Sequence, residues 1–143
     1  MIPALDAFGQ LPVGSHACTL TELYARFRVN EHRATLCDKF DHILQLAKQC
    51  GFVAVLISGS FPTEKDKPRD MDLIWITEPD VSKSTVKPEC RKLMEDTAAK
   101  EEYGWNMQYL AINHDDAKIQ YWAREFGFCS LTRRQRGMLF IDI

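Results

Sequence analysis

The sequence lacks the patterns that mark membrane-bound or exported proteins. No stretch of apolar residues approaches the roughly 20 residues that a helix needs to cross a bilayer. The N-terminus has no basic segment followed by an apolar run, which is the pattern of a secretory signal. Basic residues are not in excess either, since the formal net charge is −2. We therefore expect a cytoplasmic protein with no membrane contact, whose main role is not to coat nucleic acid.

Cysteine occurs in a number and a spacing that argue against cross-linking. The chain has five cysteines, and no two of them form a Cys-x-x-Cys pair. An odd number without paired spacing favours neither a disulfide framework nor a zinc site. Cys37 and Cys50 occupy apolar positions of a predicted helix. We interpret both as small core residues in a protein of a reducing compartment.

Internal repeats, low-complexity tracts and a convincing inner domain boundary are lacking as well. The length of 143 residues is enough to bury the core of a single domain, which we place at residues 1–143. Residues 1–18 contain several prolines and glycines and show little periodicity. This composition predicts an irregular N-terminal arm.

Hydrophobic periodicity predicts a small fold that contains both helices and strands. Thr19 and Glu22 form a capping box, which predicts a short helix beginning at Thr19. The further expected elements are a helix at 30–50, strands at 53–57 and 72–76, a helix at 90–102, a strand at 105–112, a helix at 115–126 and a strand at 138–143. This order predicts an α/β (α+β) fold with a mixed sheet of about four strands flanked by helices.

A Gly-Ser turn and a pair of aspartates connect two of the expected strands. Gly59 and Ser60 follow the apolar run at 53–57, and after a charged loop Asp70 and Asp72 open the next apolar run. Because side chains on a strand alternate between its faces, we expect both carboxylates on one side, where they can converge on a cation. Glycine lets the backbone approach a bulky anion, and the serine adds a hydroxyl group. The pattern predicts phosphates bound beside a divalent metal ion.

This arrangement resembles the signature of the nucleotidyltransferase (DNA polymerase β) superfamily. That signature is a Gly-Ser or Gly-Gly turn followed, on the next strand, by two acidic residues that alternate with apolar ones. Met71 and Leu73 are the apolar partners in this chain. The tail from Tyr121 to Gly137 also resembles small bacterial proteins related to these enzymes. The resemblance implies a minimal nucleotidyltransferase-like fold.

The resemblance also implies an activity. Asp70 and Asp72 would be catalytic and would bind Mg²⁺ or Mn²⁺, and Gly59 and Ser60 would bind the phosphates of a nucleoside triphosphate. A nucleoside monophosphate would then pass to an RNA, a protein or a small molecule, with release of pyrophosphate. The chain holds little beyond this core, so a partner or a second copy of the chain is expected to assist in binding. Small members of the superfamily often work in toxin–antitoxin or defence systems.

The third carboxylate of that superfamily is missing from the strand where it is expected. The strand at 105–112 offers Asn106 and Gln108 in its place. An amide oxygen can join a metal ion, so Gln108 is a candidate metal ligand, but an amide carries no charge and cannot act as a base. Asp142 is an alternative source of the carboxylate. The difference leaves a second hypothesis open, namely a catalytically degenerate relative that regulates by binding a nucleotide or a protein.

Two groups of basic residues are candidate anion contacts. The first group lies in the loop between the turn and the aspartates and consists of Lys65, Lys67 and Arg69. We assign Lys65 and Arg69 to nucleotide binding. The second group precedes the last expected strand and consists of Arg133, Arg134 and Arg136. It supports a third hypothesis, a non-enzymatic module that binds nucleic acid in a salt-dependent manner.

Aromatic residues of the C-terminal half have two interpretations. They are Trp105, Tyr109, Tyr121, Trp122 and Phe126. Aromatic residues at such spacing build a core more often than they form a platform on which bases stack. We therefore expect these side chains in the core.

Overall fold

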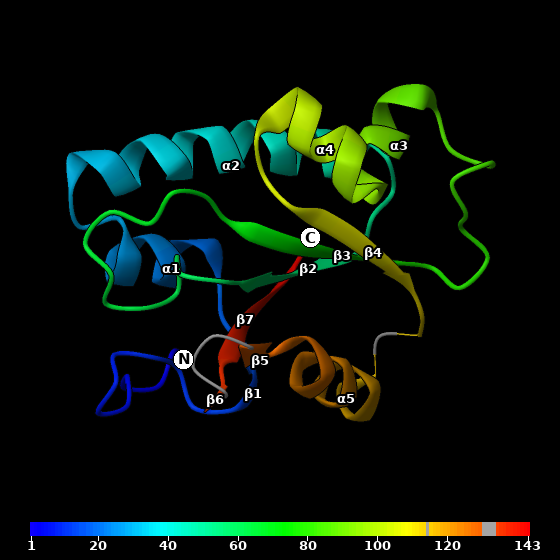
Figure 1. Ribbon diagram of the computed structural model, residues 1–143. Helices are drawn as coiled ribbons and strands as arrows, with labels where there is room; N and C mark the ends of the chain where they lie inside the picture. The colour runs from blue at the N-terminus through cyan, green and yellow to red at the C-terminus, as the bar shows by residue number, and fades with distance from the viewer. Residues whose placement is uncertain (114, 130–133) are drawn as a thin grey trace.

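A five-stranded sheet with the strand order β1-β7-β2-β3-β4 forms the centre of the computed structural model, which describes residues 1–113, 115–129 and 134–143 (Figure 1). The strands are β1 (Gly14–Ala17), β2 (Ala54–Ser58), β3 (Asp72–Thr77), β4 (Met107–Ala111) and β7 (Gly137–Asp142). β2 runs antiparallel to β3 and β7, whereas β3 pairs in parallel with β4, and β1 with β7. The expected α/β class with a mixed sheet is confirmed.

The N-terminal arm is more regular than its composition predicts. β1 lies within the segment that we expected to be irregular and adds a fifth strand at the edge of the sheet. It pairs with β7, more than a hundred residues later in the chain, with Gly14 opposite Gly137. The short pattern of the arm carries no strand signal by itself, because the pairing depends on a distant partner.

The two faces of the sheet are covered by different helices, because side chains alternate along each strand. We call one face the covered face; it carries Val55, Ile57, Leu73 and Trp75 and packs against a large cluster that includes α1 (Leu20–Phe27) and α2 (Glu31–Gln49). The helices α3 (Pro88–Met94) and α4 (Asp96–Tyr103) add to the same cluster.

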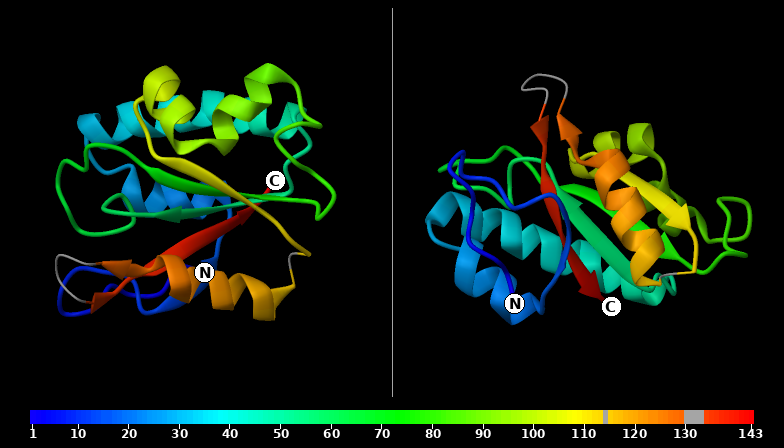
Figure 2. Two further views of the ribbon diagram at one scale, coloured as in Figure 1. Left: turned by 45° about the vertical axis from the view of Figure 1, so that its right-hand side comes forward. Right: turned by 90° about the horizontal axis from the view of Figure 1, so that it is seen from below.

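We call the other face the cleft face; it carries Ala54, Leu56, Ile74 and Ile76. A smaller apolar cluster covers it, to which the helix α5 (Asp116–Phe126) contributes Ile119 and Ala123. Figures 1 and 2 show α5 on the opposite side of the sheet from α2, α3 and α4. Among the described elements, one helix therefore covers part of the cleft face, whereas four helices pack against the covered face.

Helix caps explain where the helices begin. The Thr19 hydroxyl accepts a hydrogen bond from the backbone N–H of Glu22, as the capping box predicts. Asn30 caps α2 in the same way by accepting from the N–H of Arg33. The helix expected at 90–102 is instead two helices, because Glu95 adopts an extended backbone conformation between α3 and α4. No proline or glycine marks that break. A separate ribbon of β5 (Phe128–Cys129) and β6 (Arg134–Gln135) was also not predicted.

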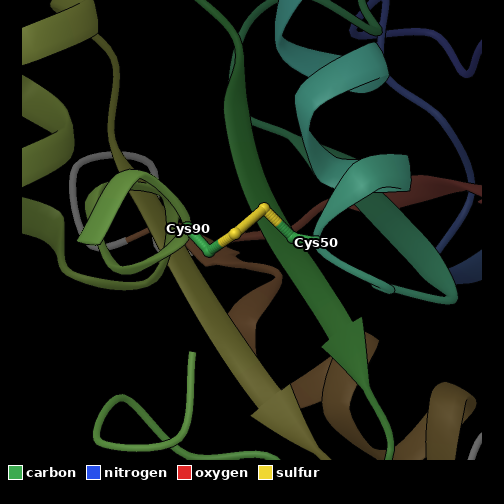
Figure 3. Close-up of a disulfide and its surroundings, with 2 residues drawn as sticks. All are labelled: Cys50 and Cys90. Atoms are coloured by element: carbon green, nitrogen blue, oxygen red, sulfur yellow. A yellow bond between two sulfur atoms is a disulfide. The ribbon is translucent and has the colours of Figure 1, made fainter. Parts of the chain in front are cut away.

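The cysteine interpretation is wrong for one residue of the two. Cys50, the C-cap residue that follows α2, forms a disulfide with Cys90 in α3 (Figure 3). The two cysteines are 40 residues apart in the sequence, and only the packing of α3 beside α2 brings them together. Closing a loop of this length typically stabilises a domain by about 2–4 kcal/mol. Cys37 is free and buried, as expected for a small core residue.

Among the residues that the structure describes, no helix combines the length and the apolar character that crossing a membrane requires.

Candidate functional site

A polar cleft of about 180 Å³ opens on the cleft face, where β2 ends and β3 and β4 begin. Ser58 pairs with Asp72 across β2 and β3, and the parallel pairing of β3 and β4 places Gln108 beside Ile74. The polar side chains that line the cleft are those of Ser58, Asp72, Asp96, Asn106 and Gln108. Phe126, at the end of α5, lines it as well. The sheet register thus gathers the second aspartate of the motif and both amides at one place.

Gly59 turns the chain directly against Asp72. Its φ of +78° is a conformation that residues with a side chain rarely adopt. A Cβ atom at this position would lie 2.4 Å from Oδ2 of Asp72. Both the conformation and the close approach therefore require glycine. The sequence predicted that this glycine would admit an anion, and within the protein the group that it admits is the carboxylate of Asp72.

The carboxylate of Asp72 is half-buried, and its described neighbours compensate its charge only in part. Burial, followed by the negative charge of Asp70, raises its pKa to about 6. Asn106 and Lys100 act in the opposite direction without cancelling the rise. Among the described residues, Oδ1 of Asp72 is buried and accepts no hydrogen bond. An unpaired buried acceptor is costly to fold, and it is a suitable ligand for a cation.

Asp70 has a different environment from Asp72. It precedes β3, so the alternation of side chains along that strand does not determine its direction. Its side chain is 19% exposed, and Oδ2 lies 3.8 Å from Nζ of Lys100 in α4. Asp70 is therefore compensated by a lysine, and it is near enough to Asp72 for its charge to raise the pKa of that residue.

Asp96 is a carboxylate of the cleft that the sequence did not suggest. It is the first residue of α4, and its Oδ1 accepts a hydrogen bond from the backbone N–H of Met107 at the start of β4. Its position at the start of a helix could not be predicted, because residues 90–102 have the pattern of one continuous helix. Asp142, the expected substitute, pairs with Ala54 at the opposite end of β2 from Ser58, so it lies away from the cleft.

Three carboxylates near one another do not yet form a metal cage. In the part of the chain that the structure describes, no group of three histidine, cysteine, aspartate or glutamate side chains is arranged closely enough to hold an ion. The donor chemistry nevertheless suits a hard cation, since Asp72 offers an oxygen that no described residue pairs, and Asn106 and Gln108 offer amide oxygens in the same cleft. The residues present fit a magnesium ion in chemistry, with Asp72 as the first ligand.

The residues assigned to the phosphates lie in two places. Ser60 and Lys65 line a second cleft of about 330 Å³ together with Arg136, whose buried Nε has no hydrogen-bond partner among the described residues. Lys67 and Arg69 are exposed and line neither cleft. The structure therefore brings Gly59 together with Asp72, and Ser60 together with Lys65.

The arginine cluster has no single environment. Arg136 lines the second cleft, and the guanidinium of Arg134 lies 3.3 Å from the centre of the Phe8 ring. Arg133 lies outside the described residues.

Arg33 positions the loop that follows the Gly-Ser turn, a role that the sequence did not reveal. It is 1% exposed. Its guanidinium donates hydrogen bonds to the backbone carbonyls of Phe61 (2.8 Å), Thr63 (2.9 Å) and Lys65 (2.6 Å). The same group lies 4.9 Å from the centre of the Phe61 ring. A helix residue thus holds the loop of the motif through contacts with carbonyl oxygens, for which no sequence pattern exists.

The expected aromatic core is only partly correct. Trp105 is buried and packs with the covered-face cluster, and Tyr109 is partly buried there. Tyr121 and Phe126 are 55% and 37% exposed. These two lie on α5, which is buried through its smaller residues Ile119 and Ala123, so the aromatic side chains remain at the surface.

Comparison with known proteins places the chain in a family without assigning it an activity. A family of unknown function (DUF6932) matches residues 3–142. Neither curated protein sequences nor solved structures gave a match.

Proposed function

The chain belongs to the DUF6932 family, whose function is unknown, and from the residues of the polar cleft we propose that it binds a nucleoside triphosphate with Mg²⁺ or Mn²⁺ and transfers the nucleoside monophosphate to an acceptor. The observation that supports this most directly is the carboxylate of Asp72. It has a raised pKa and a buried oxygen with no hydrogen-bond partner in the described part of the chain, and the Gly59 turn packs against it. Groups with such perturbed pKa values cluster at functional sites.

The cleft residues would share the work of binding and catalysis. Asp72, with Asp70 and the amide oxygen of Gln108, would hold the ion, which would neutralise the charge of the phosphates and of the leaving pyrophosphate. Gly59 would give the phosphates access to the backbone. The acceptor hydroxyl forms a bond to the α-phosphorus while the bond to the β-phosphate oxygen breaks. The proton of the acceptor hydroxyl must pass to a base, and the carboxylate of Asp96, which lines the cleft with Asp72, would accept it.

We also propose where the acceptor of the nucleoside monophosphate binds and what would extend the site. Lys65 and Arg136, which line the second cleft beside Glu64, would contact a phosphate-bearing acceptor such as RNA. A protein or a small molecule would need other contacts. A partner protein or a second copy of the chain would extend the small site.

A second candidate function is that of a degenerate relative, which binds the nucleotide and regulates without catalysis. Asn106 and Gln108 favour it, because these amides line the cleft where carboxylates are expected. The resemblance alone suggests a toxin–antitoxin or defence system as its setting. Pyrophosphate release by the wild type, lost in Asp72→Asn, would exclude this candidate.

A cytoplasmic location also belongs to the proposal. The disulfide between Cys50 and Cys90 is an argument against it, since such bonds are rare where thiols are kept reduced.

Thermal unfolding with each nucleoside triphosphate and Mg²⁺ or Mn²⁺ tests the proposed binding. A ligand at about 100 times its dissociation constant stabilises a protein by roughly 2.7 kcal/mol, which raises the Tm by several degrees. We expect a metal-dependent rise for the wild type and for Asp142→Asn, a matched carboxylate outside the cleft, and none for Asp72→Asn. Absence of any rise with a well-folded wild type would contradict the proposal.

A further inference from the structure

Three aromatic side chains form a continuous group on α5, beside the polar cleft. The rings of Trp122 and Phe126 are stacked, with centres 5.7 Å apart and planes inclined by 27°. Tyr121 meets Trp122 edge to face, with centres 5.2 Å apart. Trp122 and Phe126 are four residues apart, the spacing that brings side chains together on one side of a helix. We call Trp122 and Phe126 the aromatic pair.

Neither residue of the aromatic pair belongs to the two apolar clusters of the described core, and Trp122 is half-buried. α5 packs on the sheet through Ile119 and Ala123, which are buried in the cleft-face cluster. Phe126 keeps 37% of its surface exposed. An exposed phenylalanine stacked on a tryptophan offers a flat apolar surface to a ligand.

Phe126 connects this surface to the candidate site, because it lines the same cleft as Asp72 and Gln108. The cleft measures about 180 Å³, whereas sites that enclose whole small molecules typically measure about 300–1,000 Å³. It has room for phosphates and an ion but not for a complete nucleotide. The remainder of the ligand must extend beyond the polar residues, and Phe126 is the apolar side of the opening.

We propose that the aromatic pair binds the base of the nucleoside triphosphate by stacking, while the cleft holds its phosphates. This inference rests on the proposed function and specifies how its substrate is recognised. Stacking uses the flat face that every base has, so it discriminates weakly between bases. The larger face of a purine gives it the greater overlap. The site is therefore expected to accept several nucleoside triphosphates, with purines bound more tightly.

The aromatic pair is held in a fixed place relative to the sheet. Gln120, two residues before Trp122 on α5, accepts a hydrogen bond from the N–H of Ser15 at 2.8 Å and donates one to its carbonyl at 2.9 Å. Gly127 ends α5 so tightly that a Cβ atom there would lie 2.4 Å from the carbonyl oxygen of Arg136. Little ordering of the protein is then required when a base stacks.

Binding of Mg-ATP and of magnesium tripolyphosphate, measured by calorimetry, separates the base from the phosphates. We expect the wild type to bind Mg-ATP more tightly than Mg-tripolyphosphate. Phe126→Ala should weaken Mg-ATP binding about 5-fold to 150-fold, the effect of losing one stacked base, and leave tripolyphosphate binding unchanged. Phe126→Leu, which keeps the apolar bulk, should weaken Mg-ATP as well. Phe128→Ala is the matched control, since Phe128 is 53% exposed and does not line the cleft.

Fluorescence gives a second and direct measurement. The chain has three tryptophans, of which Trp75 and Trp105 are buried. A base stacked at the aromatic pair should quench Trp122, whereas tripolyphosphate should not. Trp122→Phe should remove the quenching while binding persists.

The outcomes distinguish the two proposals. If the wild type binds Mg-ATP and Mg-tripolyphosphate with equal affinity, and Phe126→Ala changes neither affinity, the stacking site is overturned. The proposed phosphate site would remain supported. Equal losses in Phe126→Ala and Phe128→Ala overturn it too, because they would reflect general surface hydrophobicity. If the folded wild type binds neither compound, both proposals are wrong.

Discussion

The two faces of the sheet differ in how fully a buried charged side chain is hydrogen-bonded. Near the covered face, the buried Arg33 has its guanidinium satisfied by carbonyl oxygens and lies over an aromatic ring. On the cleft face, the carboxylate of Asp72 is half-buried with an oxygen that has no partner among the described residues. The same fold thus satisfies a buried arginine near one face and leaves one oxygen of a half-buried acid without a described partner on the other. The unsatisfied group therefore indicates function, and the satisfied one indicates structure.

Strand β3 contributes side chains both to the covered-face core and to the candidate site. Leu73 and Trp75 of β3 point into the core of the covered face, whereas Asp72 and Ile74 belong to the other face. Alternation along a single strand thus connects the larger apolar cluster to the candidate site. Stability on one side gives the carboxylate on the other a fixed position despite its unfavourable environment.

The largest effect is expected near the covered face. Arg33→Ala should reduce the free energy of unfolding by about 3 kcal/mol or more, because the carbonyls of Phe61, Thr63 and Lys65 lose a charged donor in a buried place. Urea unfolding measures the loss. Arg28→Ala is the control, since Arg28 forms a surface ion pair with Asp38 and should leave the midpoint unchanged. Equal stability of Arg33→Ala and the wild type would remove the contrast between the faces.

A smaller loss is expected where the turn touches the cleft face. Gly59→Ala should cost about 1–2 kcal/mol for its left-handed conformation, and more because the new Cβ must displace the carboxylate of Asp72. Gly51 has nearly the same φ, +79°, with open space around it. Gly51→Ala should therefore show the conformational cost alone. If urea unfolding gives the two variants the same loss, the contact between turn and carboxylate is unimportant.

The smallest effect, a gain of stability, is expected at Asp72 itself. A raised carboxyl pKa means that the folded state loses stability as pH rises from about 4, the usual value, to about 6. Asp72→Asn should be more stable than the wild type by about 1 kcal/mol above pH 6, after allowance for solvent screening, with no difference below about pH 4. Unfolding across this pH range measures it. Asp142→Asn should show no such gain, because Asp142 lies at the opposite end of β2 from the cleft; a loss in Asp72→Asn would contradict the argument.

Much of the fold follows from local patterns in the sequence. The capping box at Thr19 and the apolar run of β2 could be predicted because each signal lies within a few residues. β1 and the break at Glu95 are not readable. The first depends on pairing with β7, and the second has no glycine or proline to mark it.

Some residues of the candidate site can likewise be predicted from the sequence, and others cannot. The sequence predicts the Gly59 turn and Asp72 together, since a short stretch of chain carries both. It cannot predict Asp96 or Phe126, which approach Asp72 from α4 and α5. Nor can it predict that Ser60 faces a different cleft, because the direction of a turn side chain is set by packing.

The disulfide makes the middle of the chain a covalent ring. The bond between Cys50 and Cys90 encloses β2, the Gly59 turn, the exposed loop and Asp72. A protease that cuts the loop between the turn and the aspartates would open this ring without releasing a fragment. The two halves of the motif would remain one molecule until a reductant separated them. A nicked form of the protein would therefore be invisible on a non-reducing gel and obvious on a reducing one.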